Sequence, residues 1–224
     1  MPRDRYRSAL DDLRDAVVGL GEDVVVQLET GLAALESGDP ELARAVIDGD
    51  DAINEAYLAV ESDCIDLFAL QQPVAGDLRF VAASFKILTD LERIGDLATN
   101  LGRYALAESS ESSPEVDVVA IGREARDAVE DALTAYRTRD VELCREIHAR
   151  DDRIDALCQR ASERVVRDLV ERETGNDAWA VERLLDDVSR LLLTVRDVER
   201  VADHAVNVAA RTLYVVEHDS ELLY

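Results

Sequence analysis

The stretch Asp90-Leu-Glu-Arg-Ile-Gly-Asp-Leu-Ala-Thr-Asn100 decides the fold, because the chain repeats it as Asp197-Val-Glu-Arg-Val-Ala-Asp-His-Ala-Val-Asn207. The second copy begins 107 residues after the first (197 minus 90), and six of the eleven positions are identical. Most of the other positions exchange one apolar or small residue for another. Two copies of one block imply two equivalent structural units that present the same helical face.

The similarity between the two halves extends beyond this block. Residues 138–143 correspond to residues 37–42, and residues 149–155 correspond to residues 48–54, both at an offset of 101 residues. Because the block itself is offset by 107 residues, the second half has about six extra residues before its last helix, and we place them at residues 172–177. A consistent register on both sides of one insertion indicates an internal duplication.

Composition predicts an almost entirely helical chain. Its 224 residues include only 10 Gly and 4 Pro, aromatic residues make up 4%, and Ala, Leu, Val, Asp, Glu and Arg dominate. Helices that follow one another through short turns pack antiparallel. We therefore predict an all-α protein of two pseudo-symmetric three-helix bundles, with residues 1–108 in the first, a linker at 109–116, and residues 117–224 in the second.

Apolar spacing and turn residues give the expected helices of the first half. Asp39 is the expected N-cap of a short helix that ends near Gly49, where the run Asp48-Gly49-Asp50 favours a turn. Gly19 and Gly21 should weaken the first helix locally. The four predicted segments run from Tyr6 to Leu35, from Pro40 to about Gly49, from Ile53 to about Gln71, and from about Val74 to Ala107.

The charge of the chain limits its partners and its compartment. A net charge of −24 would repel phosphate backbones, which excludes direct binding of nucleic acid as a main function. Lys86 is the only lysine among many acids, and this pattern favours a halophilic archaeal source in which salt screens self-repulsion; an acidic mesophilic protein is the alternative. No apolar run approaches the ~20 residues of a membrane span, and no signal-peptide pattern opens the chain, so we expect a cytoplasmic protein without membrane insertion.

Neither a catalytic motif nor a cofactor loop is recognisable. The chain has no Gly-rich phosphate loop, no GxSxG and no HExxH, and it lacks the Glu-x-x-His pairs of di-iron bundles. Cys64, Cys144 and Cys158 fall within helical patterns without CxxC spacing, so we interpret them as core residues. We therefore predict no catalytic residues, no organic cofactor and no enzymatic activity.

Each copy of the block places acidic residues on one side of a helix. At ~100° per residue, side chains at i, i+4 and i+8 share a stripe. The apolar residues of each block lie on roughly the opposite side and should face the core. The two stripes are Glu92, Asp96 and Asn100 in the first half, and Glu199, Asp203 and Asn207 in the second.

Carboxylates one turn apart repel each other, so their repetition in both halves suggests that a cation bridges them. Carboxylate and amide oxygens suit hard or borderline metal ions. From the preceding helices, Asp51 and Asn54 in the first half and Asp152 and Asp155 in the second are the expected further ligands; Asp50, Glu55 and Asp151 are also candidates. The alternative is a solvated acidic face, neutralised at the surface by Arg93 and Arg200.

Two other acidic residues and the three histidines are not expected to bind a metal ion. Asp90 and Asp197 fall near the apolar side of the helix, where a buried partner such as an Arg of a facing helix is expected. Of the three histidines, only His204 lies in the block, and its counterpart Leu97 is apolar. We therefore expect no histidine ligand.

The doubled block, together with Leu70-Gln-Gln-Pro-Val-Ala-Gly-Asp-Leu-Arg79, resembles the PhoU family of phosphate-uptake regulators over nearly the whole chain. The resemblance implies two three-helix bundles, and it implies E(D)xxxD motifs that bind multinuclear iron or other divalent metal clusters, such as zinc, manganese, magnesium or nickel. These motifs correspond here to Glu92/Asp96 and Glu199/Asp203. The second half lacks the Gln-Pro stretch, which puts the equivalence of the halves in doubt.

The resemblance also implies a function. It predicts a negative regulator of high-affinity phosphate uptake that contacts the ATPase of the phosphate ABC transporter and, in bacteria, a sensor histidine kinase or another regulator. A metal-dependent enzyme on a helical bundle and a purely structural interaction module are the alternatives. The long amphipathic first helix further suggests a homodimer.

Overall fold

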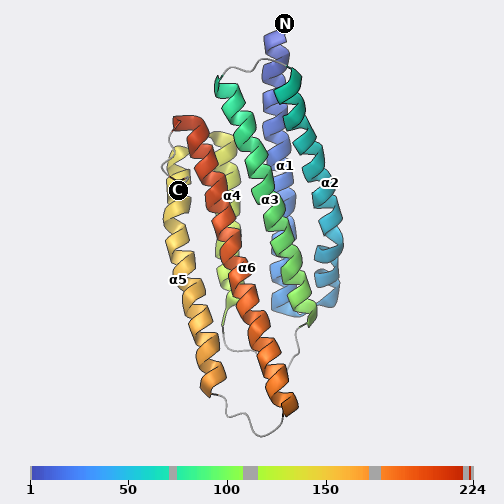
Figure 1. Cartoon of the computed structure of the whole chain (residues 1–224), viewed down its shortest axis with the longest axis vertical. Coiled ribbons are helices and arrows are strands. Elements are labelled where there is room, and N and C mark those ends of the chain that lie inside the picture. The colour runs from blue at the N-terminus through green and yellow to red at the C-terminus, as the bar shows by residue number, and fades with distance from the viewer. Residues whose placement is uncertain (1, 71–74, 108–115, 172–177, 219–221, 223–224) are drawn as a thin grey trace.

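The chain folds into six α-helices over the residues that the computed structural model describes, namely 2–70, 75–107, 116–171, 178–218 and 222. The predicted all-α fold of two three-helix bundles is confirmed, with α1, α2 and α3 in the first bundle and α4, α5 and α6 in the second (Figure 1). The helices are α1 (Pro2–Ser37), α2 (Pro40–Leu70), α3 (Ala75–Ala107), α4 (Val118–Thr138), α5 (Val141–Glu171) and α6 (Ala178–Glu217).

The prediction of a helix end near Gly49 is wrong, because α2 continues without a break from Pro40 to Leu70. One apolar stripe runs through the supposed turn and is buried on both sides of it, at Val46 and at Ile53. Packing of this stripe against α1 and α3 outweighs the ~1 kcal/mol that a glycine costs in a helix. The first half therefore consists of three long helices.

Aspartates cap the helices at equivalent positions of the two halves. Asp39 Oδ1 accepts a hydrogen bond from the Glu41 amide at 2.8 Å, which confirms the predicted N-cap. Its counterpart 101 residues later, Asp140, accepts one from the Leu143 amide at 3.1 Å. Asp117 caps α4 in the same way. The duplication therefore extends to the caps.

One continuous apolar core runs through both bundles, because α3 packs against α6 and α1 packs against α4. The three cysteines are buried in it as free thiols, as predicted.

Two predicted segments cannot be compared with the structure in full. Most of the expected linker at 109–116 lies outside the described residues, and so do all of the expected extra residues at 172–177. The apolar stripe of α1 is buried within this chain, so it gives no separate support to a homodimer.

A reciprocal close approach joins α1 and α4. A Cβ atom built on Gly21 would lie 2.3 Å from Leu133 Cδ2, and one built on Gly122 would lie 2.3 Å from Leu32 Cδ2. Gly122 and Leu133 are the counterparts of Gly21 and Leu32 at the 101-residue offset. The two helices therefore meet around a pseudo-twofold axis, with a leucine of each seated on a glycine of the other.

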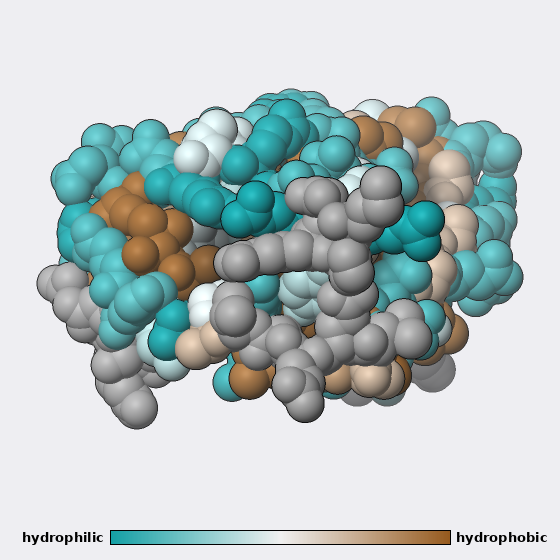
Figure 2. Space-filling view, turned by 90° about the horizontal axis from the view of Figure 1, so that it is seen from above, coloured by the Kyte–Doolittle hydropathy of each residue, from teal (hydrophilic) through white to brown (hydrophobic). Residues whose placement is uncertain are grey.

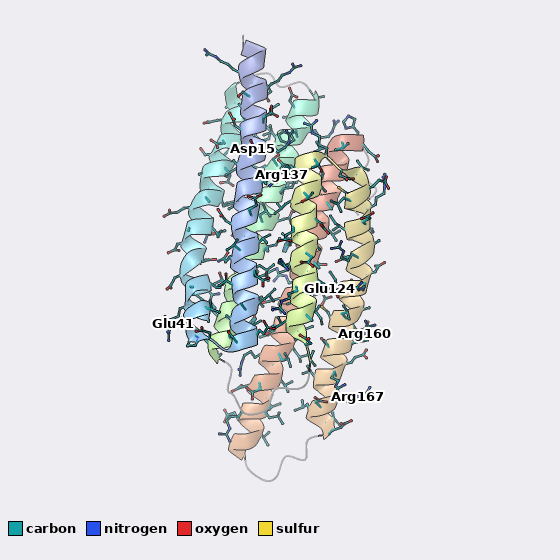
Figure 3. The ribbon with its side chains drawn as sticks, turned by 180° about the vertical axis from the view of Figure 1, so that it is seen from behind. Asp15, Glu41, Glu124, Arg137, Arg160 and Arg167 are labelled. Carbon is teal, nitrogen blue, oxygen red and sulfur yellow. The ribbon has the colours of Figure 1, made fainter. Side chains whose placement is uncertain are left out.

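Ion pairs flank this contact on the side of the molecule seen in Figure 3, where α1 and α4 run side by side. Arg123 binds Glu36 at 2.5 Å, and Arg137, labelled in the figure, pairs with Glu22. At the 101-residue offset, Arg123 corresponds to Glu22 and Arg137 to Glu36. Acids thus occupy positions on α1 whose equivalents on α4 are arginines.

Candidate functional site: the paired blocks and their acidic faces

The two copies of the block lie on α3 and α6, which pack against each other. The face predicted to be apolar is buried in both copies, as shown by Leu91 and Ile94 on α3 and Val198 and Val201 on α6. Burial of these residues fixes which side of each helix faces solvent, and the acidic stripe lies on that side. The core thus orients both acidic faces.

Asp90 and Asp197 are buried between α3 and α6, as predicted. Asp90 accepts hydrogen bonds from Asn207 Nδ2 at 3.1 Å and lies 2.9 Å from His204 Nδ1. Arg211 Nε lies 3.1 Å from the second carboxylate oxygen of Asp90. The predicted arginine from a facing helix is therefore present at Asp90.

Asp197 makes the equivalent contacts in the opposite direction. It accepts hydrogen bonds from Asn100 Nδ2 at 3.1 Å and from the Tyr104 hydroxyl at 2.8 Å, and Arg196 lies 3.3 Å away on its own helix. Burial and the bond to Asp197 raise the pKa of Tyr104 to about 12, so its hydroxyl stays a donor. Asp and Asn of each block therefore pair with Asn and Asp of the other.

The first acidic face is partly neutralised by its own helix. Arg93 lies 3.7 Å from Glu92 and 3.4 Å from Asp96. Burial raises the pKa of Glu92, nearby Asp96 and Asp50 raise it further, and Arg93 opposes them. Asp50 itself accepts hydrogen bonds from Thr99 at 2.9 Å and from Asn54 at 3.2 Å. Each of its oxygens therefore already accepts one hydrogen bond.

The second acidic face brings three carboxylates together. Single oxygens of Asp151, Asp155 and Asp203 lie within 4.8 Å of one another. Burial and the charges of Asp155 and Asp203 raise the pKa of Asp151 to about 6, and burial with Asp155 and Asp203 raises that of Glu199. Arg200, the counterpart of Arg93, is exposed and forms no ion pair with the described residues. This face therefore has uncompensated negative charge.

The structure separates the predicted metal ligands into groups. It places Asp155 and Asp203 in the carboxylate cluster and Glu199 beside it, whereas Asp51 and Asp152 lie outside the cluster; these four aspartates are all exposed. The amides of Asn100 and Asn207 donate to the aspartates of the facing block. Asp151, one of the further candidates, occupies the place in the cluster for which Asp152 was preferred. The sequence could have identified Asp151 by its position one helical turn before Asp155, on the side of the helix that carries the buried Ile154 and Cys158.

His204 is the residue that the sequence argument missed. It was set aside as a metal ligand, and the structure places it instead against the buried Asp90. Its counterpart Leu97 is buried and apolar, so the two halves differ at this position. A lone histidine in a helix gives no signal for such a contact, because the partner is 114 residues away in the chain.

The donor sets of the two faces differ in their fit to a metal ion. Three clustered carboxylates on the second face match the oxygen ligands of hard divalent cations. On the first face, Asn54 stands where the second has Asp155, and Arg93 already supplies a positive charge. The residues of the second face therefore fit a metal better than those of the first.

These features define an internally duplicated six-helix bundle that presents two related acidic helix faces. The chain belongs to the PhoU domain family, whose sequence model matches residues 17–105 and 118–212. Each match falls within one half, as the duplication requires. Among the described residues, no helix is long and apolar enough to cross a membrane.

Two bacterial relatives match nearly the whole chain in sequence. A phosphate-specific transport system accessory protein PhoU homolog of Pseudomonas aeruginosa is 32% identical over 95% of this chain and 85% of its own length. The PhoU protein of Escherichia coli K12 is 29% identical over 95% of this chain and 86% of its own.

Two solved structures have the same fold. The crystal structure of PhoU from Pseudomonas aeruginosa has a TM-score of 0.87 at 29% identity and covers 96% of this chain and 100% of its own. The phosphate transport system regulatory protein PhoU from Streptococcus pneumoniae gives 0.86 at 26% identity, over 96% and 98% of the two chains.

Proposed function

We propose that this protein is a negative regulator of high-affinity phosphate uptake that acts as a cytoplasmic adaptor on the ATPase of a phosphate ABC transporter. The observation that carries the proposal is the match of the PhoU domain family to both halves of the chain. The curated relatives are named accessory proteins of phosphate-specific transport, and one solved neighbour is named a regulatory protein of that system. A sensor histidine kinase or another regulator is the proposed second partner.

The structure supports binding to partners in preference to catalysis. Its two related acidic helix faces are carried by blocks whose other side is buried in a continuous core. Such faces suit recognition of a basic surface on a partner protein. We therefore propose no enzymatic activity.

Deletion of the gene tests the regulatory role. In phosphate-rich medium, the deletion strain should take up phosphate faster than wild type and should express its phosphate-starvation genes. Reintroduction of the wild-type gene should restore both. Unchanged uptake and unchanged expression after deletion would contradict the proposal.

Binding to the transporter is tested with purified components. The full chain should bind the purified transporter ATPase, and charge reversal on the exposed acids of one half should weaken that binding. Two variants of equal charge change, one in each half, show which half makes the contact: Asp51→Lys on the first and Asp152→Lys on the second, both at exposed positions. Absence of binding by wild type would leave the ATPase without a role as partner.

A metal ion on the second face is the other part of the proposal. Its support is the cluster of Asp151, Asp155 and Asp203, together with the raised pKa of Asp151, since closely spaced carboxylates without a cation repel each other. A bound divalent ion would neutralise these carboxylates and stabilise the packing of α5 on α6. Iron, zinc, manganese, magnesium and nickel are the ions to test.

Elemental analysis of protein purified without chelator tests this site. Wild type and a Glu92→Gln/Asp96→Asn variant should retain metal, whereas an Asp155→Asn/Asp203→Asn variant should lose it. Added metal should also raise the melting temperature of wild type but not that of the second variant. Equal metal content in all three proteins would refute a specific site on the second face.

A further inference from the structure

A cleft of about 450 Å³ opens at the end of the molecule where α1 and α3 begin and α4 and α6 end. Both halves line it, through Arg7 and Arg14 on α1, Gly76 and Asp77 on α3, and Arg139 just after α4. Figure 2 looks onto this end, where strongly hydrophilic residues lie between apolar patches. The volume is within the range of small-molecule sites.

The charge of this cleft is opposite to that of the chain. Its lining has three arginines and two aspartates, which leaves one net positive charge in a chain of net charge −24. A second charged cavity, between α4 and α5, has four acids and two arginines. A positive concavity on a strongly acidic surface attracts small anions while the surrounding surface repels larger acidic partners.

The three arginines differ in how they are held. The guanidinium of Arg14 lies 4.9 Å from the centre of the Phe80 ring and bonds to Asp11 at 3.0 Å, and 15% of its side chain is exposed. Arg7 and Arg139 are exposed and have no hydrogen bond or ion pair with any residue that the structure describes. Arg14 is thus fixed by aromatic packing, and the other two have free donors.

The start of α3 adds backbone donors to the same cleft. Gly76 and Asp77 belong to its first turn, whose amide groups have no carbonyl partner within the helix and carry the positive end of the helix dipole. A Cβ built on Gly76 would have no atom within 4 Å, so the backbone is open to a ligand there. Burial raises the pKa of the neighbouring Tyr6, and the negative charge of the Asp77 carboxylate raises it further.

The charge pattern of the cleft is not repeated in the other half, where the pocket at the symmetry-related position is lined mainly by apolar residues and has Asp117, Asp187 and Arg190 as its charged groups. At the 101-residue offset, Arg7 corresponds to Glu108 and Arg14 to Glu115, so the arginines of α1 have acidic counterparts in the sequence. Gly76 and Asp77 belong to the Gln-Pro stretch that also occurs only in the first half. The arginines of α1 and the Gln-Pro stretch therefore line the same cavity, and neither has an equivalent in the second half of the sequence.

We infer that this cleft binds an oxyanion of the phosphate class, with Arg7 and Arg139 as direct ligands, Arg14 as the fixed charge behind them, and the first turn of α3 as the backbone donor. A guanidinium group can donate two parallel hydrogen bonds to two phosphate oxygens, and a helix N-terminus adds hydrogen bonds from backbone amides. The inference goes beyond the regulatory role and does not depend on it. Inorganic phosphate and a phosphate monoester share this chemistry.

Isothermal titration calorimetry on the full chain tests the site. Phosphate-free protein is titrated at constant ionic strength with inorganic phosphate and, separately, with adenosine monophosphate. The variants are Arg7→Gln and Arg139→Asn, where asparagine tolerates the left-handed φ of 60° at that position. Arg5→Gln is the matched control, because it removes one charge from the same end of α1 but does not line the cleft. Thermal melting confirms that each variant is folded.

Each cleft variant should weaken anion binding about tenfold or more, because it removes a charge-assisted hydrogen bond, whereas Arg5→Gln should change it less than about twofold. Equal affinity for both probes would identify the phosphate group alone as the ligand, and tighter binding of the monophosphate would identify an organic phosphate; both support the site. No binding of either probe up to about 10 mM would overturn it. So would equal affinity of wild type and the cleft variants. The site would also be overturned if the cleft variants lost binding to the ATPase while wild type bound neither anion. The arginines would then form a protein-docking surface.

Discussion

Replacing Gly21 by alanine introduces a methyl group where α4 already has a side chain. The new Cβ would lie 2.3 Å from Leu133 Cδ2 and 2.7 Å from its Cδ1. Leu133 is buried, so its movement disturbs the core between the two halves. Overpacking of this kind costs about 1–3 kcal/mol.

Gly19 offers the matched control on the same helix. A Cβ at Gly19 would have no atom within 4 Å, so Gly19→Ala has only the gain in helix propensity, about 1 kcal/mol. The same gain offsets part of the clash at Gly21. We therefore expect Gly19→Ala to stabilise the protein by up to about 1 kcal/mol and Gly21→Ala to destabilise it by roughly 1 kcal/mol, a difference of about 2 kcal/mol.

Urea unfolding followed by far-ultraviolet circular dichroism measures both variants against wild type. The two midpoints should move in opposite directions with unchanged slopes. A Gly21→Ala protein at least as stable as Gly19→Ala would refute the close approach of α1 and α4. A Gly21→Ala/Leu133→Ala double variant should show that the two substitutions are not additive, because the second removes the atoms that clash.

Three further predictions concern single aspartates. Asp197→Ala should lower the free energy of unfolding by about 2 kcal/mol in urea titrations, because it leaves the half-buried donors Tyr104 and Asn100 without their acceptor; a loss below about 0.5 kcal/mol would contradict this. The pKa of Asp151 is raised from 3.8 to about 6, so the folded state binds more protons than the unfolded state between these values, and stability falls as pH rises through that window. In metal-free protein, Asp151→Asn should therefore add about 1 kcal/mol at pH 7 and almost nothing near pH 4, after allowance for solvent screening; an equal effect at both pH values would contradict the assignment. Asp117→Ala should cost about 1 kcal/mol in thermal unfolding through loss of the α4 cap, and no change would show that the cap contributes nothing.

The sequence predicted those parts of the fold that depend on local pattern. The apolar spacing around Leu91 and Val198 identified which side of α3 and α6 is buried, because burial follows the helical period. The N-cap at Asp39 was also predicted, since capping involves residues two or three positions apart. The unbroken path of α2 through Gly49 was not, because tertiary packing outweighs one unfavourable residue.

The candidate site was predicted only in part, and the reason is again the range of the contacts. The pairing of Asn100 with Asp197 depends on how α3 and α6 face each other, and no spacing within one helix reveals it. The choice of Asp151 over Asp152 required knowing which side of α5 faces α6. The contrast between Arg93, which pairs with acids, and Arg200, which does not do so among the described residues, is likewise a matter of side-chain placement.

The charge pattern at the α1–α4 contact decides which half-chains can associate. Two copies of the first half, brought together about the same twofold axis, would place Glu22 against Glu36 on both sides, and two copies of the second would place Arg123 against Arg137. Only a mixed pair matches acid with base, and like charges in contact oppose the other pairings. A duplicated gene whose halves diverged in this way produces a heterodimer within one polypeptide, in which the tether keeps the complementary half at high local concentration. Each half is then free to acquire residues, such as His204 and Arg211, that a symmetric dimer would have to present twice.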